Sequence, residues 1–402
     1  MLDVPDEILL NILSKLNQKE LFLNVALVNK HFHRISKDPS LLKVVILEHI
    51  DNYVFESVEN LLKNATMLET FIIKGGVMNK HFLLSIALQT SKVLKTVKIE
   101  RQFNQNTAKV LLKHGHNIEH LDLYNANKES KYEEIIFMSN MKKLKSIKFN
   151  HFHESLNENH IRSIALDCQK LKQIKLSRVD VFSDEIMDEF CETVKSVESL
   201  HFTAFYSLKW KVKSLASVEH LTELKLHIYY TMFDVTQVSN ILKVPNLEVF
   251  SFKWDHYEEK YQEGKIVLCN MFSKFKMTNL KELSVQLFHE SKPLDVFKVI
   301  IEGLGFKLET LELNCFTEPD CRGIKCLTSN NPTLSIEDVK AILKKSPNLD
   351  CLEINGRELP EQFLCEIEYK YKTKILVDQF KRIAMRRFKT FNPRFFENMI
   401  YL

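Results

Sequence analysis

The chain has 402 residues, of which 56 are basic and 52 acidic, so its net charge of +4 is close to balance. This balance argues against a nucleic-acid or membrane binder that acts through overall charge. Eight Gly and nine Pro are few for this length, which disfavours long flexible linkers and Gly-rich phosphate loops. The acidic start and the lack of an apolar run of about 18 residues predict neither a signal peptide nor a membrane span. Scattered cysteines without a C-x-x-C pair favour reduced thiols in a cytoplasmic and/or nuclear protein.

Three short helices are expected first, over about 5–16, 17–26 and 29–37. Pro5 suits the first turn of a helix, and the acidic residues after it suit the positive end of the helix dipole. The first helix carries an apolar stripe of Ile8, Leu9, Ile12, Leu13 and Leu16. Three short helices bury only part of such a stripe. Surplus apolar surface is typical of a partner site.

Residues 4–44 resemble the F-box in order and spacing. The resemblance rests on Val4-Pro5, where the family usually has Leu-Pro, on Glu7-Ile8-Leu9, and on the segments "ALVNKHF" and "DPSLL". It implies a domain that docks on a Skp-type adaptor, which bridges to the cullin scaffold of a ubiquitin ligase. The adaptor contacts that it implies are Val4, Pro5, Ile8, Leu9, Ile12, Leu13, Leu16, Val28 and Phe32.

Two alternatives account for the same stretch. The apolar residues would be only the core of a capping domain, and Leu21 and Ile35 are expected to be core in either case. The basic residues of the third helix would also suit a helix-turn-helix reader of DNA, whose recognition helix enters the major groove. A solvated charged face explains those residues more simply, because the neighbouring helix is Leu-rich and the chain is nearly neutral. No nucleic-acid partner is therefore expected.

Behind this domain runs a repeat of the form apolar-x-x-apolar-x-apolar, spaced mostly 24 to 28 residues apart. It begins at Leu42, Leu68, Leu94, Ile118, Leu144, Leu171, Val197, Leu221, Leu247, Leu280, Leu308 and Leu349, and Ile375 continues the register. The apolar pair at period two predicts a strand, and segments such as "NKHFLLSIALQT", "NENHIRSIALDCQK" and "SIEDVKAILKKS" predict helices between the strands. A purely helical array is the rival, but the two-residue alternation recurs too regularly for it.

These units resemble leucine-rich repeats of the longer kind, which have a helix on the outer face. The resemblance implies an α/β protein with a horseshoe of parallel strands inside and helices outside. The expected organisation is a three-helix F-box at 1–44, a leucine-rich-repeat solenoid at 45–378, and a C-terminal helical cap or tail at 379–402. An amphipathic cap is favoured for the tail, with a membrane-surface helix as the alternative.

The residue between the two strand apolars is expected to point into the concave face of the horseshoe. Adjacent strands lie about 4.8 Å apart. Basic residues at this position on consecutive strands would therefore repel one another unless an anion neutralises them. The candidate target-binding residues in this and the neighbouring columns are Lys98, Tyr124, Lys148, Lys175, His201, Lys225, His227 and Lys253. They suit an acidic or phosphorylated segment of a target protein. The alternative is solvated lysines that are partly offset by neighbours such as Glu100 and Glu223.

Two units exceed the period, near 253–279 and 314–338. Pro319, Gly323 and Asn330-Asn331-Pro332 predict that the second contains a loop overhanging one rim, and such loops often contact ligands, although tolerated drift explains them equally well. The spacing of Cys315, Cys321 and Cys326 fits no zinc pattern.

No P-loop, G-x-S-x-G or H-E-x-x-H motif occurs, so neither catalysis nor a cofactor or metal is expected. The sequence predicts the non-catalytic substrate-recognition subunit of an SCF-type cullin-RING ubiquitin ligase. A non-ligase leucine-rich-repeat scaffold or inhibitor is the alternative.

Overall fold

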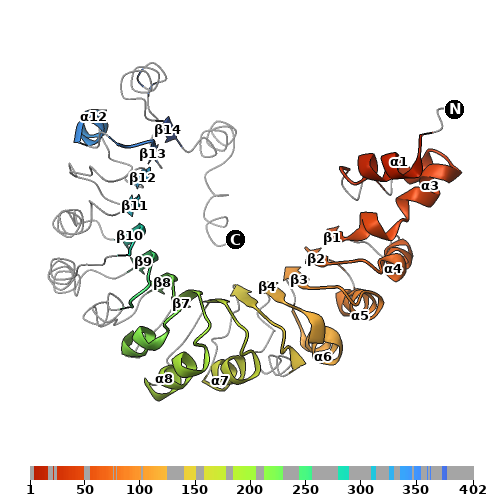
Figure 1. Ribbon diagram of the computed structural model, residues 1–402, viewed down its shortest axis with the longest axis horizontal. Coiled ribbons are helices and arrows are strands. Elements are labelled where there is room, and N and C mark those ends of the chain that lie inside the picture. The colour runs from red at the N-terminus through yellow and green to blue at the C-terminus, as the bar shows by residue number, and fades with distance from the viewer. Residues whose placement is uncertain are drawn as a thin grey trace, which may run out of the picture. The chain divides into compact units, whose positions relative to one another are not determined.

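The computed structural model falls into two compact units. Unit 1 contains Met1–Trp210 with Ser217–Leu221, and unit 2 contains Lys211–Ala216 with Thr222–Leu402. The structure describes residues 4–16, 21, 25–48, 55–75, 77, 79–100, 103–124, 140–150, 158–177, 184–204, 212–229, 244–255, 279–288, 309–313, 326–329, 336–345, 348–354, 360, 363 and 374–377. Short strands recur at regular intervals along both units (Figure 1).

Unit 1 begins with a small helical domain. Its elements are α1 (Asp6–Leu13), the 3-10 helix η1 (Val25–Leu27), α3 (Lys30–Ser36) and the 3-10 helix η2 (Pro39–Leu42). Pro5 immediately precedes α1, and its carbonyl accepts hydrogen bonds from the N–H groups of Ile8 and Leu9, each at 3.1 Å. The helix ends at Leu13, three residues before the predicted end.

The third helix starts where the sequence predicted, because Asn29 caps it. The Asn29 side chain accepts from the N–H groups of His31 and Phe32, each at 2.9 Å, which satisfies two donors of the first helical turn. The domain core consists of Leu9, Leu13, Leu21 and Ile35, with Val4, Leu10, Val25, Phe32 and Leu41 packed against it. The expectation that Leu21 and Ile35 are core residues is confirmed.

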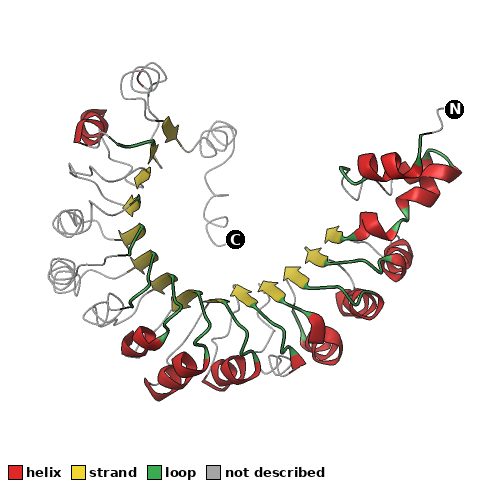
Figure 2. Ribbon diagram, viewed as in Figure 1, coloured by secondary structure: helices red, strands yellow, loops and turns green. Residues whose placement is uncertain are grey.

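The rest of unit 1 alternates strands and helices. The strands are β1 (Val44–Glu48), β2 (Thr70–Lys74), β3 (Thr96–Glu100), β4 (His120–Tyr124), β5 (Ser146–Asn150), β6 (Gln173–Ser177) and β7 (Ser199–Ala204). The helices are α4 (Phe55–Asn64), α5 (Lys80–Thr90), α6 (Gln105–His114) with the 3-10 helix η4 (Gly115–Asn117), α7 (Glu158–Asp167) and α8 (Asp184–Thr193). Within this unit the strands line the inner side of an arc and these helices its outer side (Figure 2).

Each strand of unit 1 pairs in parallel with the next one along the chain. The two apolar residues of each strand are buried under the helices, as with Phe71 and Ile73 in β2, which have no exposed surface. The leucine that opens each repeat is buried as well, for example Leu68 and Leu94. The residues between the buried pair therefore form rows across the opposite face, because side chains alternate along a strand.

Unit 2 continues the same pattern. Its strands are β8 (Glu223–Tyr229), β9 (Val249–Asp255), β10 (Glu282–Phe288), β11 (Thr310–Leu313), β12 (Cys326–Ser329), β13 (Cys351–Ile354) and β14 (Lys374–Val377), and α12 (Ile336–Lys345) is an α-helix among its described residues. These strands also pair in parallel and in chain order. The 3-10 helix η6 (Val212–Ser217) precedes β8. The leucine-rich-repeat architecture predicted from the sequence is confirmed in both units.

One strand of unit 2 was not expected. Within the long unit near 314–338, Cys326–Ser329 form strand β12 between β11 and β13. Leu327 lies in register with Leu311 on one side and Leu352 on the other. The interval from Leu308 to Leu349 therefore contains a further strand. Backbone pairing with both neighbouring strands holds this strand in the sheet, although its sequence shows only one leucine of the repeat pattern.

Candidate functional site

An outward row of apolar side chains lies along the N-terminal helix. Ile8 and Ile12 are 52% and 54% exposed, and Leu16 follows just beyond the end of α1, also exposed. Ile8 and Ile12 are four residues apart within α1, which places their side chains on the same helix face. Leu27, the last residue of η1, and Val28, which follows it, are more exposed still, at 77% and 64%. The surplus apolar surface that the sequence indicated is present on this domain.

The structure divides the predicted adaptor contacts into two groups. The exposed group comprises Pro5, Ile8, Ile12, Leu16 and Val28. Val4 and Phe32 are half-buried against the core, and Leu9 and Leu13 belong to it with exposed fractions of 8% and 3%. An adaptor role for Leu9 and Leu13 does not fit this burial, since the side chains that hold the three helices together are not available to a partner.

Sequence reasoning missed Leu27. It lies in the segment "ALVNKHF" that carried part of the F-box resemblance, and an apolar residue directly before the exposed Val28 was the available signal. Within the three-residue η1, Val25 packs on the core while Leu27 is on the surface.

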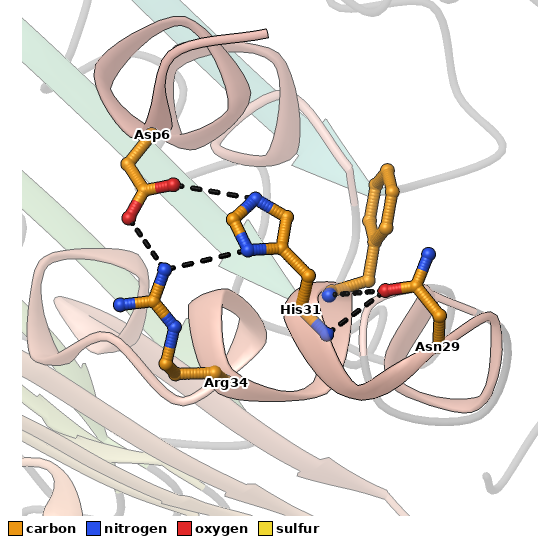
Figure 3. A network of polar contacts seen from close by, with 5 residues as sticks. Asp6, Asn29, His31 and Arg34 are labelled. Carbon is orange, nitrogen blue, oxygen red and sulfur yellow. Dashed lines mark hydrogen bonds and ion pairs between the residues drawn. The ribbon is translucent and has the colours of Figure 1, made fainter. Parts of the chain in front are cut away.

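A polar network fixes the start of α1 against α3 (Figure 3). Asp6 accepts from Nη2 of Arg34 at 2.7 Å and lies 3.3 Å from Nε2 of His31. Nη2 of Arg34 is also 3.4 Å from Nδ1 of His31. All three side chains are well exposed, so the ion pairs contribute at most about 1 kcal/mol each. Their effect is to orient α1, and with it the exposed apolar row, relative to α3.

The strand face of unit 1 is the side of the sheet away from the helices. The residue between the two buried apolar residues of each strand lies on this face, and these residues form a row across the strands, called the middle row here. The parallel register places its members side by side: Ile46, Ile72, Lys98, Asp122, Lys148, Lys175 and His201. The row runs from apolar to basic along the chain. Ile46 was missed by the sequence analysis, although it stands in register one repeat before Ile72.

The predicted target-binding lysines differ in their ionic neighbours. Lys98 pairs with Glu100 at 3.0 Å, and Lys225 of unit 2 pairs with Glu223 at 2.6 Å. These are the two carboxylates that the sequence analysis put forward as offsets. For Lys98 and Lys225 the ordinary explanation, a solvated and partly neutralised lysine, is therefore supported.

The other predicted residues occupy the expected strand positions. Tyr124 lies opposite Asn150, and His227 lies opposite Lys253 in unit 2. His201 is half-buried, and its Nε2 is 3.3 Å from the Ser199 hydroxyl. Lys148 and Lys175 lie opposite one another on β5 and β6, and within the described residues neither forms an ion pair.

A second charged row lies where each strand begins, and sequence reasoning missed it. The row, called the edge row here, consists of Lys43, Glu69, Lys95, Glu119, Lys145, Lys172 and Glu198, each joined to the next by a backbone hydrogen bond. Glu119 lies between two lysines, 2.6 Å from Lys145 and 3.6 Å from Lys95, and the hydrogen bond from Lys145 lowers the pKa of Glu119. The signal was the alternation of charge one residue before each strand.

Several predicted features fall outside the described residues. These are residues 314–325 and 330–335, where an overhanging loop was expected, most of the long unit near 253–279, and the tail at 379–402. Where the chain is described, no group of His, Cys, Asp and Glu has the arrangement of a metal site. A membrane-spanning helix was also sought in the described part, and none is long and apolar enough.

Comparison with known proteins supports the assignment of the N-terminal domain in particular. The family model "F-box-like" matches residues 1–47. Curated protein sequences give no match. Among solved structures, the crystal structure of the yeast Rad7 and Elc1 complex has a TM-score of 0.48 and 14% identity, covering 92% of this chain and 87% of that chain. Internalin C2 from Listeria monocytogenes has a TM-score of 0.31 and 13% identity, covering 57% of this chain and 74% of that chain.

The family match covers the helical domain and the first strand, and the parallel strand register defines the repeats behind that domain. The predicted F-box resemblance is confirmed at the level of the domain. The chain is an F-box-like domain followed by leucine-rich repeats.

Proposed function

We propose that this protein is a non-catalytic substrate receptor of an SCF-type ubiquitin ligase. The F-box-like domain would dock on a Skp-type adaptor, which joins it to a cullin, and the strand face of the repeats would hold the target protein. The observation that carries the proposal is the exposed apolar row of α1 within the matched domain. A few side chains that become fully buried in a contact carry most of the binding energy at protein interfaces.

The receptor would act by positioning. A target bound to the strand face is held near the ubiquitin donor, so its lysines are presented at high effective concentration. The rigid join between domain and repeats supports this role, because Leu41 packs on the helical core while Leu42, the next residue, is buried at the start of the first repeat.

The adaptor step is tested by co-purification of the full chain with a Skp-type adaptor. Wild-type protein should retain the adaptor, whereas the Ile8→Asp/Ile12→Asp variant should lose it, because two charges would have to be buried in an apolar contact. Leu166→Asp is the matched control. Leu166 is 53% exposed on α7, close to the 54% of Ile12, but lies in the repeats.

Retention of the adaptor by the double variant, or failure of the wild-type protein to bind it, would contradict the proposal. In the second case, a chain that still captures a target protein would be the non-ligase scaffold or inhibitor. Circular dichroism of each variant shows whether the fold survives, so that loss of binding is not mistaken for unfolding.

A further inference from the structure

Two cysteines occupy matching positions on neighbouring strands of unit 2. Cys326 is the first residue of β12 and Cys351 the first residue of β13, and the two are direct partners in the parallel register. Adjacent strands lie about 4.8 Å apart, and the Cα atoms of disulfide-bonded cysteines lie about 4.4–6.8 Å apart. The register therefore brings the two cysteines within bonding range without a change of fold.

Both positions fall on the face of the sheet opposite the core. Leu352 follows Cys351 and is buried, and its register partner on β12 is Leu327. Because successive residues of a strand point to opposite faces, the position before each leucine lies on the other face. Cys351 is half-buried there, so a small reagent can reach its thiol.

A lysine occupies the next position in the same row. Lys374 is the first residue of β14 and the register partner of Cys351, one strand spacing away at about 4.8 Å. Glu353 shares the face of Cys351 but lies two positions along β13, or about 6.6 Å away. On this face the cation is therefore closer than the carboxylate. A nearby cation favours the thiolate, which is the reactive form of cysteine.

The described cysteines of unit 1 have different surroundings. Cys168 and Cys191 are both 0% exposed. Burial raises the pKa of Cys168 to about 12, which keeps its thiol protonated. Buried thiols of this kind are inert. The matched pair in unit 2 is therefore a local feature and not the general condition of cysteines in this protein.

We infer that Cys326 and Cys351 form a dithiol site that hydrogen peroxide converts into a disulfide between β12 and β13. The Cys351 thiolate attacks one oxygen of the peroxide, the O–O bond breaks, and the other oxygen leaves as hydroxide, so that Cys351 becomes a sulfenic acid. The Cys326 sulfur then attacks the Cys351 sulfur. The S–S bond forms, and the sulfenic hydroxyl leaves as water with the Cys326 proton. The thiols are oxidised, and the peroxide is reduced to water.

The disulfide would be reversible. Side chains of register partners point the same way, so the Cβ atoms stay about as far apart as the strands, at about 4.8 Å. The Cβ atoms of a disulfide lie about 3.8 Å apart on average, so the bond must draw the two strands together. Strained disulfides are reduced more easily than relaxed ones. A thiol reductant would therefore restore the dithiol.

Oxidation would also restrain the repeat that contains α12. This helix lies in the chain between the two cysteines, and its Val339 and Leu343 are buried in the core. A crosslink between the two ends of a segment restricts the open forms that the segment can adopt. Amide exchange in α12 should therefore slow at least about tenfold in the oxidised protein.

Tryptic mapping of the full chain tests for the bond directly. Reduced protein is treated with hydrogen peroxide, blocked with N-ethylmaleimide and digested without reductant. Trypsin places Cys326 and Cys351 in separate peptides that contain no other cysteine. The cleavage sites that bound these peptides are Lys325, Lys340, Lys345 and Arg357. Mass spectrometry should show the two peptides joined after peroxide, and dithiothreitol should separate them.

Single variants separate this pair from its neighbours. Cys326→Ser and Cys351→Ser should each abolish the linked peptide and the slower exchange of α12. Cys315→Ser removes a cysteine nearby in the sequence and should leave both intact. Lys374→Gln should slow formation of the disulfide at least about threefold. Circular dichroism of the reduced variants shows whether each one folds.

The assignment is overturned if peroxide yields no linked peptide in native protein, or yields it only in urea. It is also overturned if Cys315→Ser removes the link while the protein remains folded. An unchanged rate in Lys374→Gln would overturn the part given to that lysine. The dithiol site goes beyond the proposed function, and adaptor co-purification reports on that function separately. A linked peptide from a chain that binds no adaptor would leave the site standing and overturn the ligase role.

Discussion

Replacing Leu13 by Ala is expected to destabilise the helical domain by about 3 kcal/mol, whereas Ile12→Ala on the same helix should cost about 1 kcal/mol or less. Leu13 is 3% exposed in the cluster with Leu9, Leu21 and Ile35, and Ile12 is 54% exposed. A buried Leu→Ala change loses about 2–5 kcal/mol because it combines lost transfer energy with a cavity.

The smaller value for Ile12 follows from its exposure. The substitution removes three carbon atoms worth about 0.8 kcal/mol each when fully buried, and about half of their surface is already in water. The higher helix propensity of Ala returns a few tenths of a kcal/mol. The two variants should therefore differ by about 2 kcal/mol, or about 30-fold in the opening equilibrium of α1.

Hydrogen exchange of the α1 amides in the full chain measures this equilibrium. Leu13→Ala should accelerate exchange strongly and Ile12→Ala only slightly, while Ile12→Ala should still weaken adaptor binding. Equal acceleration in both variants would show that the two side chains share one environment, and the division of α1 into a core face and a docking face would be refuted.

Three other perturbations test local features. Asn29→Ala should cost about 1 kcal/mol and speed amide exchange in α3, because two N–H groups lose their acceptor; unchanged exchange would argue against the cap. Burial lowers the pKa of Lys80 to about 8 from its ordinary 10.5, so the unfolded chain binds this proton more tightly and stability should rise between about pH 8 and 10.5. Lys80→Met should then stabilise the fold at pH 7 and lose that advantage as the pH approaches 10.5; a pH-independent difference in urea unfolding would contradict this. Burial also raises the pKa of Cys168 to about 12, so iodoacetamide at pH 8 should modify it slowly in folded protein and rapidly in urea; fast reaction in the folded state would refute its burial.

Much of the fold was predictable because its signals are local. The apolar pair of each strand and the leucine before it recur within a single repeat, and the register from Val45 to Leu352 follows from aligning those repeats. Strand β12 was not predicted, because the repeats around it are unevenly spaced in the sequence. Periodicity alone therefore merged it into one long unit. Its assignment needed the backbone pairing with β11 and β13.

The candidate site was predictable in composition but not in orientation. A helical stripe of Ile8, Leu9, Ile12 and Leu13 indicates that one side is apolar, but not which members turn inward when α1 packs on α3. Glu100 was put forward as an offset for Lys98, and their ion pair is present, but the column of lysines offered no indication that Lys148 and Lys175 would form no ion pair within the described residues. Lys80, a charged residue at the start of α5, offered no sign that it would be buried.

The sequence by itself determined the order of parts in this protein, an F-box-like domain and then a repeat of strand and helix, because spacing along the chain dictates which residues can share a face. Only the tertiary structure decided which apolar side chains are core and which remain for a partner, and which lysines are neutralised. The burial of Leu9 and Leu13 depends on Ile35 of another helix. Ion pairs such as Lys145 with Glu119 and Lys172 with Glu198 join neighbouring repeats, and no pattern within one element specifies such contacts.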